Sequence, residues 1–297
     1  MSTAITHSEQ DPALQRIMQS VERLGLSQNL LDLETQGYTV IKGVLHAEQI
    51  ERVKAAILRR VEGDLGRPVN IDTATADDFA NMTYIPYMLY DDVVFEEVLM
   101  LEQPLTLMTY LLGESCLLSS IGCHFKGMGE QGVVPLHSDN GNGIPQPFPA
   151  YSLCANINYA LTPYSKEAGA LAVVPGSHRL GRPPTAREMR LAGERANRDA
   201  QAMDLDPGDA VIWHGNTWHG SYPREIPGIR MNLAVFCARQ FVVTQEQHKG
   251  VVPQEVLDRH ANDERFLRLL GAKQPYGWQQ EGPDYSVMAQ APRGYFD

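Results

Sequence analysis

The chain has 297 residues, 43% of them hydrophobic, which suffices for one large domain or two small ones. A formal net charge of −11 without a cluster of lysine and arginine argues against a nucleic-acid partner and, more weakly, against an anionic membrane surface. The sequence has no basic-then-apolar leader, no apolar run of membrane-spanning length and no CxxC pair among its four cysteines. We therefore expect a cytoplasmic protein with free thiols and no membrane partner.

Helical and strand patterns alternate over the N-terminal part of the chain. Apolar residues recur at helical spacing over residues 11–24, and a β-branched run bounded by glycine follows at 37–45. A second amphipathic helix is expected from His46 to Val61. These patterns predict a helix, a strand and a further helix in that order.

Residues 66–90 lack a regular period and contain Pro, Asn, Asp and Thr, which is typical of a long ordered loop. The methionine and tyrosine side chains in this loop either line a substrate pocket or cover the edge of the core. Helical spacing resumes over 93–112, with a break or kink expected at Pro104 and a stop at Gly113.

From residue 116 onward the pattern changes to short apolar runs separated by Gly, Pro and Asn. This spacing is typical of a double-sheet jelly roll. We therefore expect a mainly β protein with flanking helices around a double-stranded β-helix core of the cupin type. The expected strands are residues 116–126, 133–137, 152–160, 170–174, 210–213 and 231–238.

We expect one domain over residues 1–297. Residues 182–206 are charged and rich in alanine, which favours a helical or mobile insertion between strands, and 253–270 has the pattern of a final amphipathic helix. The expected parts of the domain are the N-terminal helices, first strand and lid loop (1–115), the jelly-roll core (116–240), and the C-terminal helix and tail (241–297).

His137, Asp139 and His219 are the strongest candidate site residues. An HxD tripeptide alone is weak evidence, but this one follows a Val-Val-Pro-Leu run. Alternation along a strand places the His137 and Asp139 side chains on one face at the strand end, and the alternative is that the two residues cap a turn. Two imidazoles and one carboxylate on one face of Fe(II) leave three positions open, enough for a bidentate 2-oxo acid and dioxygen.

His219 and His214 compete to be the second histidine of this site. We prefer His219 because the Gly-Ser that follows it allows close approach of a ligand, and because Arg230 then begins the next apolar strand. His214 is expected to be a hydrogen-bonded strand residue. An arginine inside a barrel needs a carboxylate partner, which the distal carboxylate of 2-oxoglutarate would supply to Arg230 in bidentate fashion.

Together these motifs resemble the phytanoyl-CoA dioxygenase family. The resemblance extends from the strand after Gly37 through the HxD tripeptide and the PGSH element that ends at His178 to Ser221 and Arg230. The PGSH element and the spacing from the HGS tripeptide to Arg230 are its specific parts. His178 is expected to be a structural turn residue in this family and stays outside the metal site.

The resemblance implies that Fe(II) is bound by His137, Asp139 and His219. It also implies that Arg230 and Ser221 bind the far carboxylate of 2-oxoglutarate, whose near end chelates the iron. These five residues would then form one connected site for the metal and the cosubstrate.

Two departures from the family pattern are present. Leu136 stands where the family usually has an aromatic residue, and the upstream polar residue that helps to hold the cosubstrate has no clear match. Lys126 and His124 are the candidates for that upstream role.

The implied activity is that of an Fe(II)- and 2-oxoglutarate-dependent oxygenase, which uses O2 to hydroxylate or otherwise oxidise an unactivated carbon of a small-molecule substrate. A neutral or weakly polar secondary metabolite is the preferred substrate, and Asp139 argues against a halogenase. The alternative is a cupin-like metal-binding protein or isomerase without oxygenase activity, which has no need of Arg230. A homodimer is compatible with the sequence. Candidate substrate-pocket residues are Met82, Tyr84, Tyr87, Asn140 and Phe148.

Overall fold

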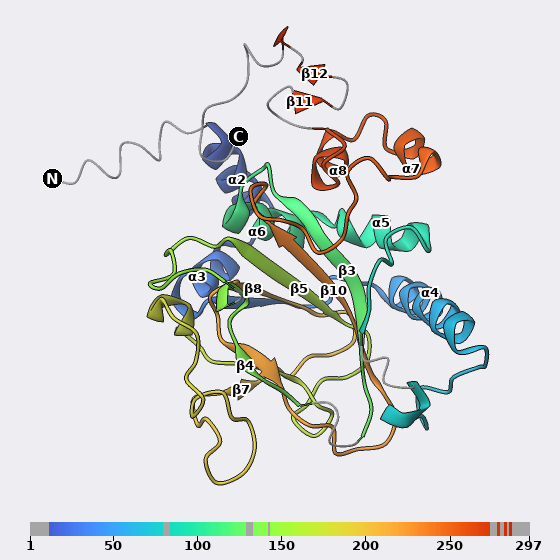
Figure 1. The fold of residues 1–297 in the computed structure, drawn as a ribbon, viewed down its shortest axis with the longest axis vertical. Helices are drawn as coiled ribbons and strands as arrows, with labels where there is room; N and C mark the ends of the chain where they lie inside the picture. The colour runs from blue at the N-terminus through green and yellow to red at the C-terminus, as the bar shows by residue number, and fades with distance from the viewer. Residues whose placement is uncertain are drawn as a thin grey trace, which may run out of the picture.

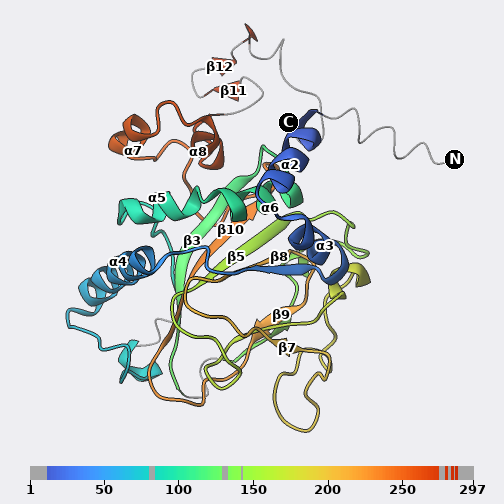
Figure 2. The same ribbon diagram turned by 180° about the vertical axis from the view of Figure 1, so that it is seen from behind.

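Two antiparallel β-sheets face each other, and helices cover the outer side of the larger sheet (Figures 1 and 2). This arrangement is seen in a computed structural model of the chain. No helix in the described ranges is long and apolar enough to cross a membrane. The structure describes residues 12–79, 84–128, 133–141, 143–273, 278–279, 282–283 and 285–286.

The N-terminal elements follow the predicted order, with one additional helix. Helix α2 (Pro12–Arg23) is followed by α3 (Ser27–Gln36), which the sequence patterns did not predict, and then by β1 (Tyr38–Ile41) and α4 (Ala47–Leu65). Gly37 ends α3 in a left-handed conformation with φ 81°, and its N–H donates to a carbonyl in the last turn. This glycine turns the chain directly from α3 into β1.

The predicted helix over 93–112 is two helices. After the short elements η1 (Ala76–Phe79) and β2 (Tyr84–Ile85) come α5 (Val93–Leu99) and α6 (Glu102–Leu112). The break precedes Pro104, which lies in the first turn of α6, because a proline is tolerated there but lacks the N–H that would continue the preceding helix. The glycine after α6 ends it, as predicted.

The larger sheet contains four of the predicted strands, each within two residues of its expected ends. Its strand order is β1-β8-β5-β10-β3-β2, and all pairs are antiparallel. Strand β10 lies near the centre of this sheet and begins at Arg230, the residue that was predicted to bind the cosubstrate. The four strands are β3 (Leu117–Lys126), β5 (Cys154–Ala160), β8 (Ala210–His214) and β10 (Arg230–Ala238).

The smaller sheet lies opposite and has the order β4-β9-β6-β7. Two of its strands were predicted, whereas β9 and β7 are too short to give a pattern in the sequence. The two facing sheets confirm the jelly-roll expectation. The four strands are β4 (Val134–His137), β9 (His219–Ser221), β6 (Leu171–Val173) and β7 (Gln201–Ala202).

The prediction of a helix within 182–206 was wrong. The segment consists of turns and strand β7, preceded by the single turn η3 (Ser177–Leu180). Prolines at its start and a glycine at 193 interrupt the helical composition, and tertiary bonds hold it instead. Arg182, for example, pairs with Glu188 at 2.8 Å.

The predicted C-terminal helix over 253–270 is also two helices, α7 (Gln254–Arg259) and α8 (Glu264–Leu269). Asp263 caps α8 by accepting a bond from the Phe266 N–H, which fixes a new helix start within the amphipathic pattern. Farther on, residue pairs 278–279 and 282–283 form the short hairpin β11 (Trp278–Gln279) and β12 (Gly282–Pro283).

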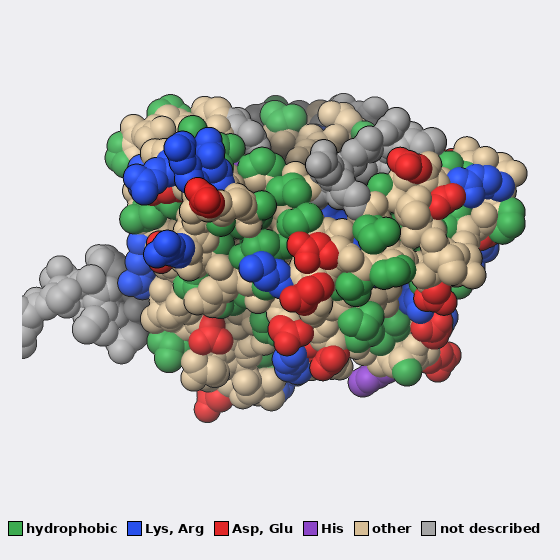
Figure 3. Space-filling model, turned by 90° about the horizontal axis from the view of Figure 1, so that it is seen from below, with side chains coloured by type: hydrophobic (Ala, Val, Ile, Leu, Met, Phe, Trp, Pro, Cys, Tyr) green, Lys and Arg blue, Asp and Glu red, His purple; other side chains and the backbone are tan. Residues whose placement is uncertain are grey.

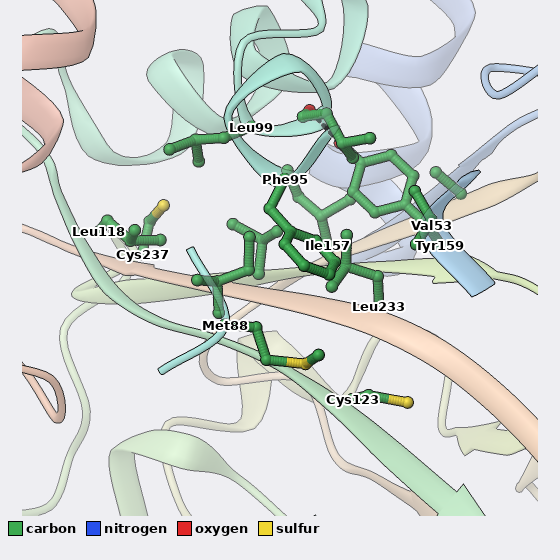
Figure 4. Close-up of a cluster of buried hydrophobic side chains, with 14 of the residues drawn as sticks. Val53, Met88, Phe95, Leu99, Leu118, Cys123, Ile157, Tyr159, Leu233 and Cys237 are labelled. Atoms are coloured by element: carbon green, nitrogen blue, oxygen red, sulfur yellow. Dashed lines mark hydrogen bonds between the residues drawn. The ribbon is translucent and has the colours of Figure 1, made fainter. Parts of the chain in front are cut away.

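The main core lies between the larger sheet and the helices. Ile157 and Tyr159 of β5 and Leu233 of β10 gather beneath Phe95 of α5 (Figure 4). Each side chain of this kind contributes about 2 kcal/mol when fully buried. Because side chains alternate along a strand, the intervening residues of β5 and β10 point toward the smaller sheet. One face of the larger sheet is thus left for a site.

On the face seen in Figure 3, basic side chains of described residues lie in small groups among acidic and hydrophobic ones. Side chains of both signs are thus present on this face, although the net charge of the chain is −11.

We predict that Gly37→Ala destabilises the fold more than Gly43→Ala. Both glycines have positive φ, 81° and 59°, which costs an alanine about 1–2 kcal/mol. A Cβ on Gly37 would also overlap the His178 ring and lie 2.6 Å from Thr217 Oγ1, whereas one on Gly43 meets nothing within 4 Å. Overpacking adds about 1–3 kcal/mol. Urea denaturation measures both, and equal losses would contradict the role of His178 as packing beneath this turn.

Candidate metal and cosubstrate site

The structure brings His137, Asp139 and His219 together at one end of the facing sheets. His137 and His219 are directly opposite each other in the β4–β9 pair, with ring centroids 4.3 Å apart. Asp139 begins the turn η2 (Asp139–Gly141), and its Oδ1 lies 4.0 Å from His137 Nε2 and 3.7 Å from His219 Nε2. The three donor atoms lie within 4.8 Å of one another, a spacing that suits a shared ion.

Backbone carbonyls fix the orientation of both imidazoles. His137 Nδ1 lies 3.0 Å from the carbonyl oxygen of Pro135, and His219 Nδ1 lies 2.9 Å from that of Thr217. Since a carbonyl only accepts, each Nδ1 carries the proton and each Nε2 presents its lone pair toward Asp139. This is the tautomer that a metal requires.

Burial determines the charge of His219, and a hydrogen bond orients Asp139. Burial lowers the pKa of His219 to about 4, so its ring is neutral at physiological pH. Asn156 donates from Nδ2 to Asp139 Oδ2 at 2.9 Å, which leaves Oδ1 facing the two histidines. The donor set and its supporting bonds therefore fit a divalent transition metal.

Two buried cations lie in the same cavity as the triad. Arg230 and Lys126 are directly opposite each other in the β10–β3 pair, and each is 5% exposed. Arg230 donates to the Gly169 carbonyl at 2.8 Å, while its Nε has no partner. Lys126 donates to Ser221 Oγ at 2.5 Å and to a neighbouring carbonyl. Among the described residues no carboxylate pairs with either cation, so like charges face each other without an anion.

This arrangement changes the pKa of Lys126. Burial, with the adjacent Arg230 charge adding to it, lowers the pKa of Lys126 to about 6. His124, two positions back on β3, has an exposed side chain that lines the same cavity, and desolvation by the surrounding atoms lowers its pKa to about 3. His124 is therefore a neutral wall residue, and Lys126 is the better of the two upstream candidates for cosubstrate binding.

A cavity of about 430 Å³ joins the triad to the two cations. The smaller sheet contributes its opposite wall, including Val134, Leu171 and the residues around His219. The larger sheet contributes the floor, which includes Ser120, Asn156, Asn158, Trp213, Asn232 and Phe236.

Comparison with known proteins adds to this geometry. A model of the phytanoyl-CoA dioxygenase family, PhyH, matches residues 33–232. The chain belongs to this family. The match covers most of the described fold, from α3 to the first residues of β10.

Curated relatives of this PhyH-family chain match over shorter segments. Dioxygenase lolE1 of Epichloe uncinata is 31% identical over 128 residues, 42% of this chain and 46% of the relative. Dioxygenase FrzG of a Cladobotryum species is 26% identical over 134 residues, 42% of each chain. The matched segment thus spans less than half of the length of either relative.

Solved structures share the fold of this family member. HygX from Streptomyces hygroscopicus, crystallised with nickel and 2-oxoglutarate bound, has a TM-score of 0.57 at 17% identity over 73% of this chain and 88% of HygX. EctD from S. alaskensis, with 2-oxoglutarate and 5-hydroxyectoine, has a TM-score of 0.57 at 18% identity over 72% and 76%. At these identities the likeness establishes the two-sheet fold.

Tyr84 is the one predicted pocket residue that lines the cavity. Its ring stacks on His124 with centroids 4.4 Å apart. It lies flat on the sheet because Gly122 has no Cβ, and a Cβ there would approach the Tyr84 ring to 2.8 Å. Met82 lies outside the described residues.

The other predicted pocket residues do not line the cavity. Tyr87 is 52% exposed, and its N–H is bound to Glu246. Asn140 is buried but bonds to Asn216, so it stabilises the turn after the triad. Phe148 is buried, with its backbone bonded to the Gly181 carbonyl. These three predictions rested on composition near the site, which does not report which way a side chain points.

His214 and His178, the two histidines that were kept out of the predicted site, have the structural surroundings expected of them. His214 Nε2 lies 3.2 Å from the Ala150 carbonyl and its Nδ1 accepts from the Asn216 N–H, so neither nitrogen is available at the triad. His178 Nε2 lies 3.2 Å from the Glu34 carbonyl, beneath the Gly37 turn.

Sequence reasoning missed the amide side chains of the cavity. Asn156 and Asn158 alternate with apolar residues in β5, and Asn232 follows Arg230 by two in β10. Two asparagines at a period of two in a buried strand are a signal that could have identified them, since an apolar core excludes such residues unless they are bonded. Gln245 lies beyond the last strand and has no comparable signal.

We predict that Asn156→Ala lowers the affinity for Fe(II) by about 10–100-fold, because Asp139 loses the bond that orients it. Asn158→Ala is the matched control, since Asn158 lines the same cavity without a bond to Asp139. Anaerobic titration with Fe(II), followed by calorimetry, measures both variants. Equal affinities would contradict the orienting role of Asn156.

Proposed function

We propose that this protein is an Fe(II)- and 2-oxoglutarate-dependent oxygenase that oxidises an unactivated carbon of a small-molecule substrate with O2. The observation that carries the proposal is the pair of buried cations, Arg230 and Lys126, in one cavity with the triad. A dicarboxylate that reaches from the triad to the pair would supply the missing anion.

The proposed roles follow from the bonds of each side chain. His137, Asp139 and His219 would hold Fe(II), which when bound supplies the activation of dioxygen that is coupled to decarboxylation of 2-oxoglutarate. Arg230 would bind the far carboxylate, with its unpartnered Nε directed to an acceptor the protein itself does not provide. Ser221 would bind the same carboxylate, and Lys126, which donates to Ser221 Oγ, would lie beside it.

Asp139 remains a ligand in this proposal, which disfavours halogenation, a reaction that needs the carboxylate removed. The second candidate, a cupin-like metal-binding protein or isomerase, would use the same triad. It gives no reason for burying two basic side chains in register, because without an anion the charged form of each is destabilised, as the lowered pKa of Lys126 indicates. The oxygenase is therefore favoured.

The four cysteines support the proposed cytoplasmic location. All four are buried free thiols, which suits a reducing compartment.

We predict that anaerobic addition of Fe(II) and 2-oxoglutarate gives a visible charge-transfer band, and that succinate forms on exposure to O2. In His219→Ala the band and the turnover are lost. In Arg230→Ala Fe(II) still binds, but the Kd for 2-oxoglutarate rises by about 30-fold or more, because a buried charge pair contributes about 2 kcal/mol or more. Absence of the band in the wild type, or equal loss of iron in both variants, would overturn the assignment.

We predict that 2-oxoglutarate binding takes up about one proton, through Lys126. In the free protein the pKa of Lys126 is lowered to about 6, and a bound carboxylate raises it. The bound state therefore holds more protons above pH 6, so the affinity is greatest below that pH and weakens as the pH rises, by about tenfold per unit at most. Calorimetry in buffers of different ionisation enthalpy counts the protons.

Lys126→Met is the control for this uptake, because it keeps the length of the side chain and removes the titrating group. The difference between wild type and variant isolates Lys126 from every other titrating group in the cavity. Equal proton uptake in the two proteins would show that Lys126 does not contact the cosubstrate.

A further inference from the structure

The part of the cavity beyond the metal and cosubstrate groups carries no charge. The ionised side chains that line it are Lys126, Asp139 and Arg230, and all three have roles in the proposed function, on which this inference rests. His124 and Tyr84 line it in neutral form, since desolvation lowers the pKa of the first and raises that of the second. A charged group of a substrate would meet no opposite charge here, which is costly in a buried site.

What remains is a mixture of amide and apolar groups. Asn158 is 8% exposed and lines the cavity, and its side chain makes no hydrogen bond to the described residues. Asn232 is fully buried, and its Nδ2 has no partner. Val134, Trp213 and Phe236 supply apolar surface around them. Asn232 Oδ1 already accepts from the His124 N–H at 3.1 Å, so Asn232 retains a donor, whereas the Asn158 amide retains both a donor and an acceptor. A donor beside an acceptor is the complement of another amide or a lactam.

Gln245 completes this set from the rim of the cavity. Its backbone N–H donates to Ser119 Oγ at 3.0 Å, and its Oε1 accepts from Ser120 Oγ at 2.9 Å. With Oε1 occupied, the Nε2 donors are the part of the head group left for a ligand. Gln245 is the only cavity residue among the described ones that follows the last strand of the larger sheet.

The neighbouring Glu246 holds this segment rigidly against β3. Glu246 is 1% exposed and its N–H donates to the Ser119 carbonyl at 2.7 Å. Its carboxylate accepts from the N–H groups of Tyr87 and Ile121 at 2.7 and 3.3 Å. A donor that is fixed before binding loses little entropy when it meets its acceptor, which is what recognition of one particular group requires.

We infer that the substrate is an uncharged small molecule carrying an amide or lactam group, and that Gln245 positions it by donating from Nε2 to the carbonyl oxygen. The cavity of about 430 Å³ lies in the lower part of the range of about 300–1,000 Å³ for small-molecule sites. A coenzyme A thioester is disfavoured, since its phosphates need basic residues and the lining offers none beyond the cosubstrate pair.

The test compares three probes of nearly equal size. At about pH 6, N-acetyl-L-phenylalaninamide is neutral, N-acetyl-L-phenylalanine is an anion and L-phenylalaninamide is a cation. Each is titrated calorimetrically into the anaerobic protein loaded with Fe(II) and 2-oxoglutarate. We expect the neutral probe to bind about tenfold more tightly than either ion, or better. Equal or tighter binding of an ion, or no binding by any of the three, overturns the inference.

Variants of two glutamines on either side of Glu246 test the role of Gln245. Gln245→Glu replaces the donor with a carboxylate, so the neutral probe should weaken by about tenfold while the cationic probe gains affinity. Both side chains are exposed, but Gln247 does not line the cavity, so Gln247→Glu adds the same charge outside it and should change neither affinity. A gain by the cation cannot arise from misfolding. Unchanged binding in Gln245→Glu overturns the role of Gln245.

The charge-transfer band shows whether the proposed function fails or only the proposed substrate class. If Fe(II) and 2-oxoglutarate give no band, the proposed function itself fails. If the band forms but the neutral probe is not preferred, only the substrate class is wrong.

Discussion

The alternation of side chains along β5 and β10 is the constraint on which the rest of the molecule depends. Ile157 and Leu233 point toward the helices and build the core, so the residues between them must point toward the smaller sheet. Asn156 and Arg230 are placed in the cavity by the same register that packs the core. A slip of one residue would exchange the two sets, and both packing and site would be lost.

The cost of this arrangement is concentrated at Lys126 and Arg230. Two like charges in register inside a protein are unfavourable, and the fold tolerates them because one of them is largely neutral above pH 6. Hydrogen bonds to backbone carbonyls stabilise both side chains. The Tyr164 ring lies 4.8 Å from the Arg230 guanidinium and adds a cation–π contact. A site of this kind is prepared for an anion, and the anion restores the charge that burial removed.

Much of the fold and part of the site follow from local patterns. The strands at 117–126, 154–160 and 230–238 are visible as short apolar runs between Gly, Pro and Asn, and the HxD tripeptide at a strand end places His137 beside Asp139. The predictions that failed concern segments where composition and geometry disagree. Alanine-rich residues 182–206 form turns because prolines and tertiary bonds outweigh helix propensity.

The sequence by itself predicted the jelly-roll class, the candidate metal ligands and a carboxylate partner for Arg230, because strand patterns and short motifs can be recognised in stretches of a few residues. Only the tertiary structure decided that Lys126 faces Arg230, that Tyr84 rather than Tyr87 lines the cavity, and that Gln245 completes it. The bonds that decide this join residues 95 and 125 positions apart, Lys126 to Ser221 and Ser120 to Gln245. Register between strands distant in sequence sets such contacts, and no local period encodes it.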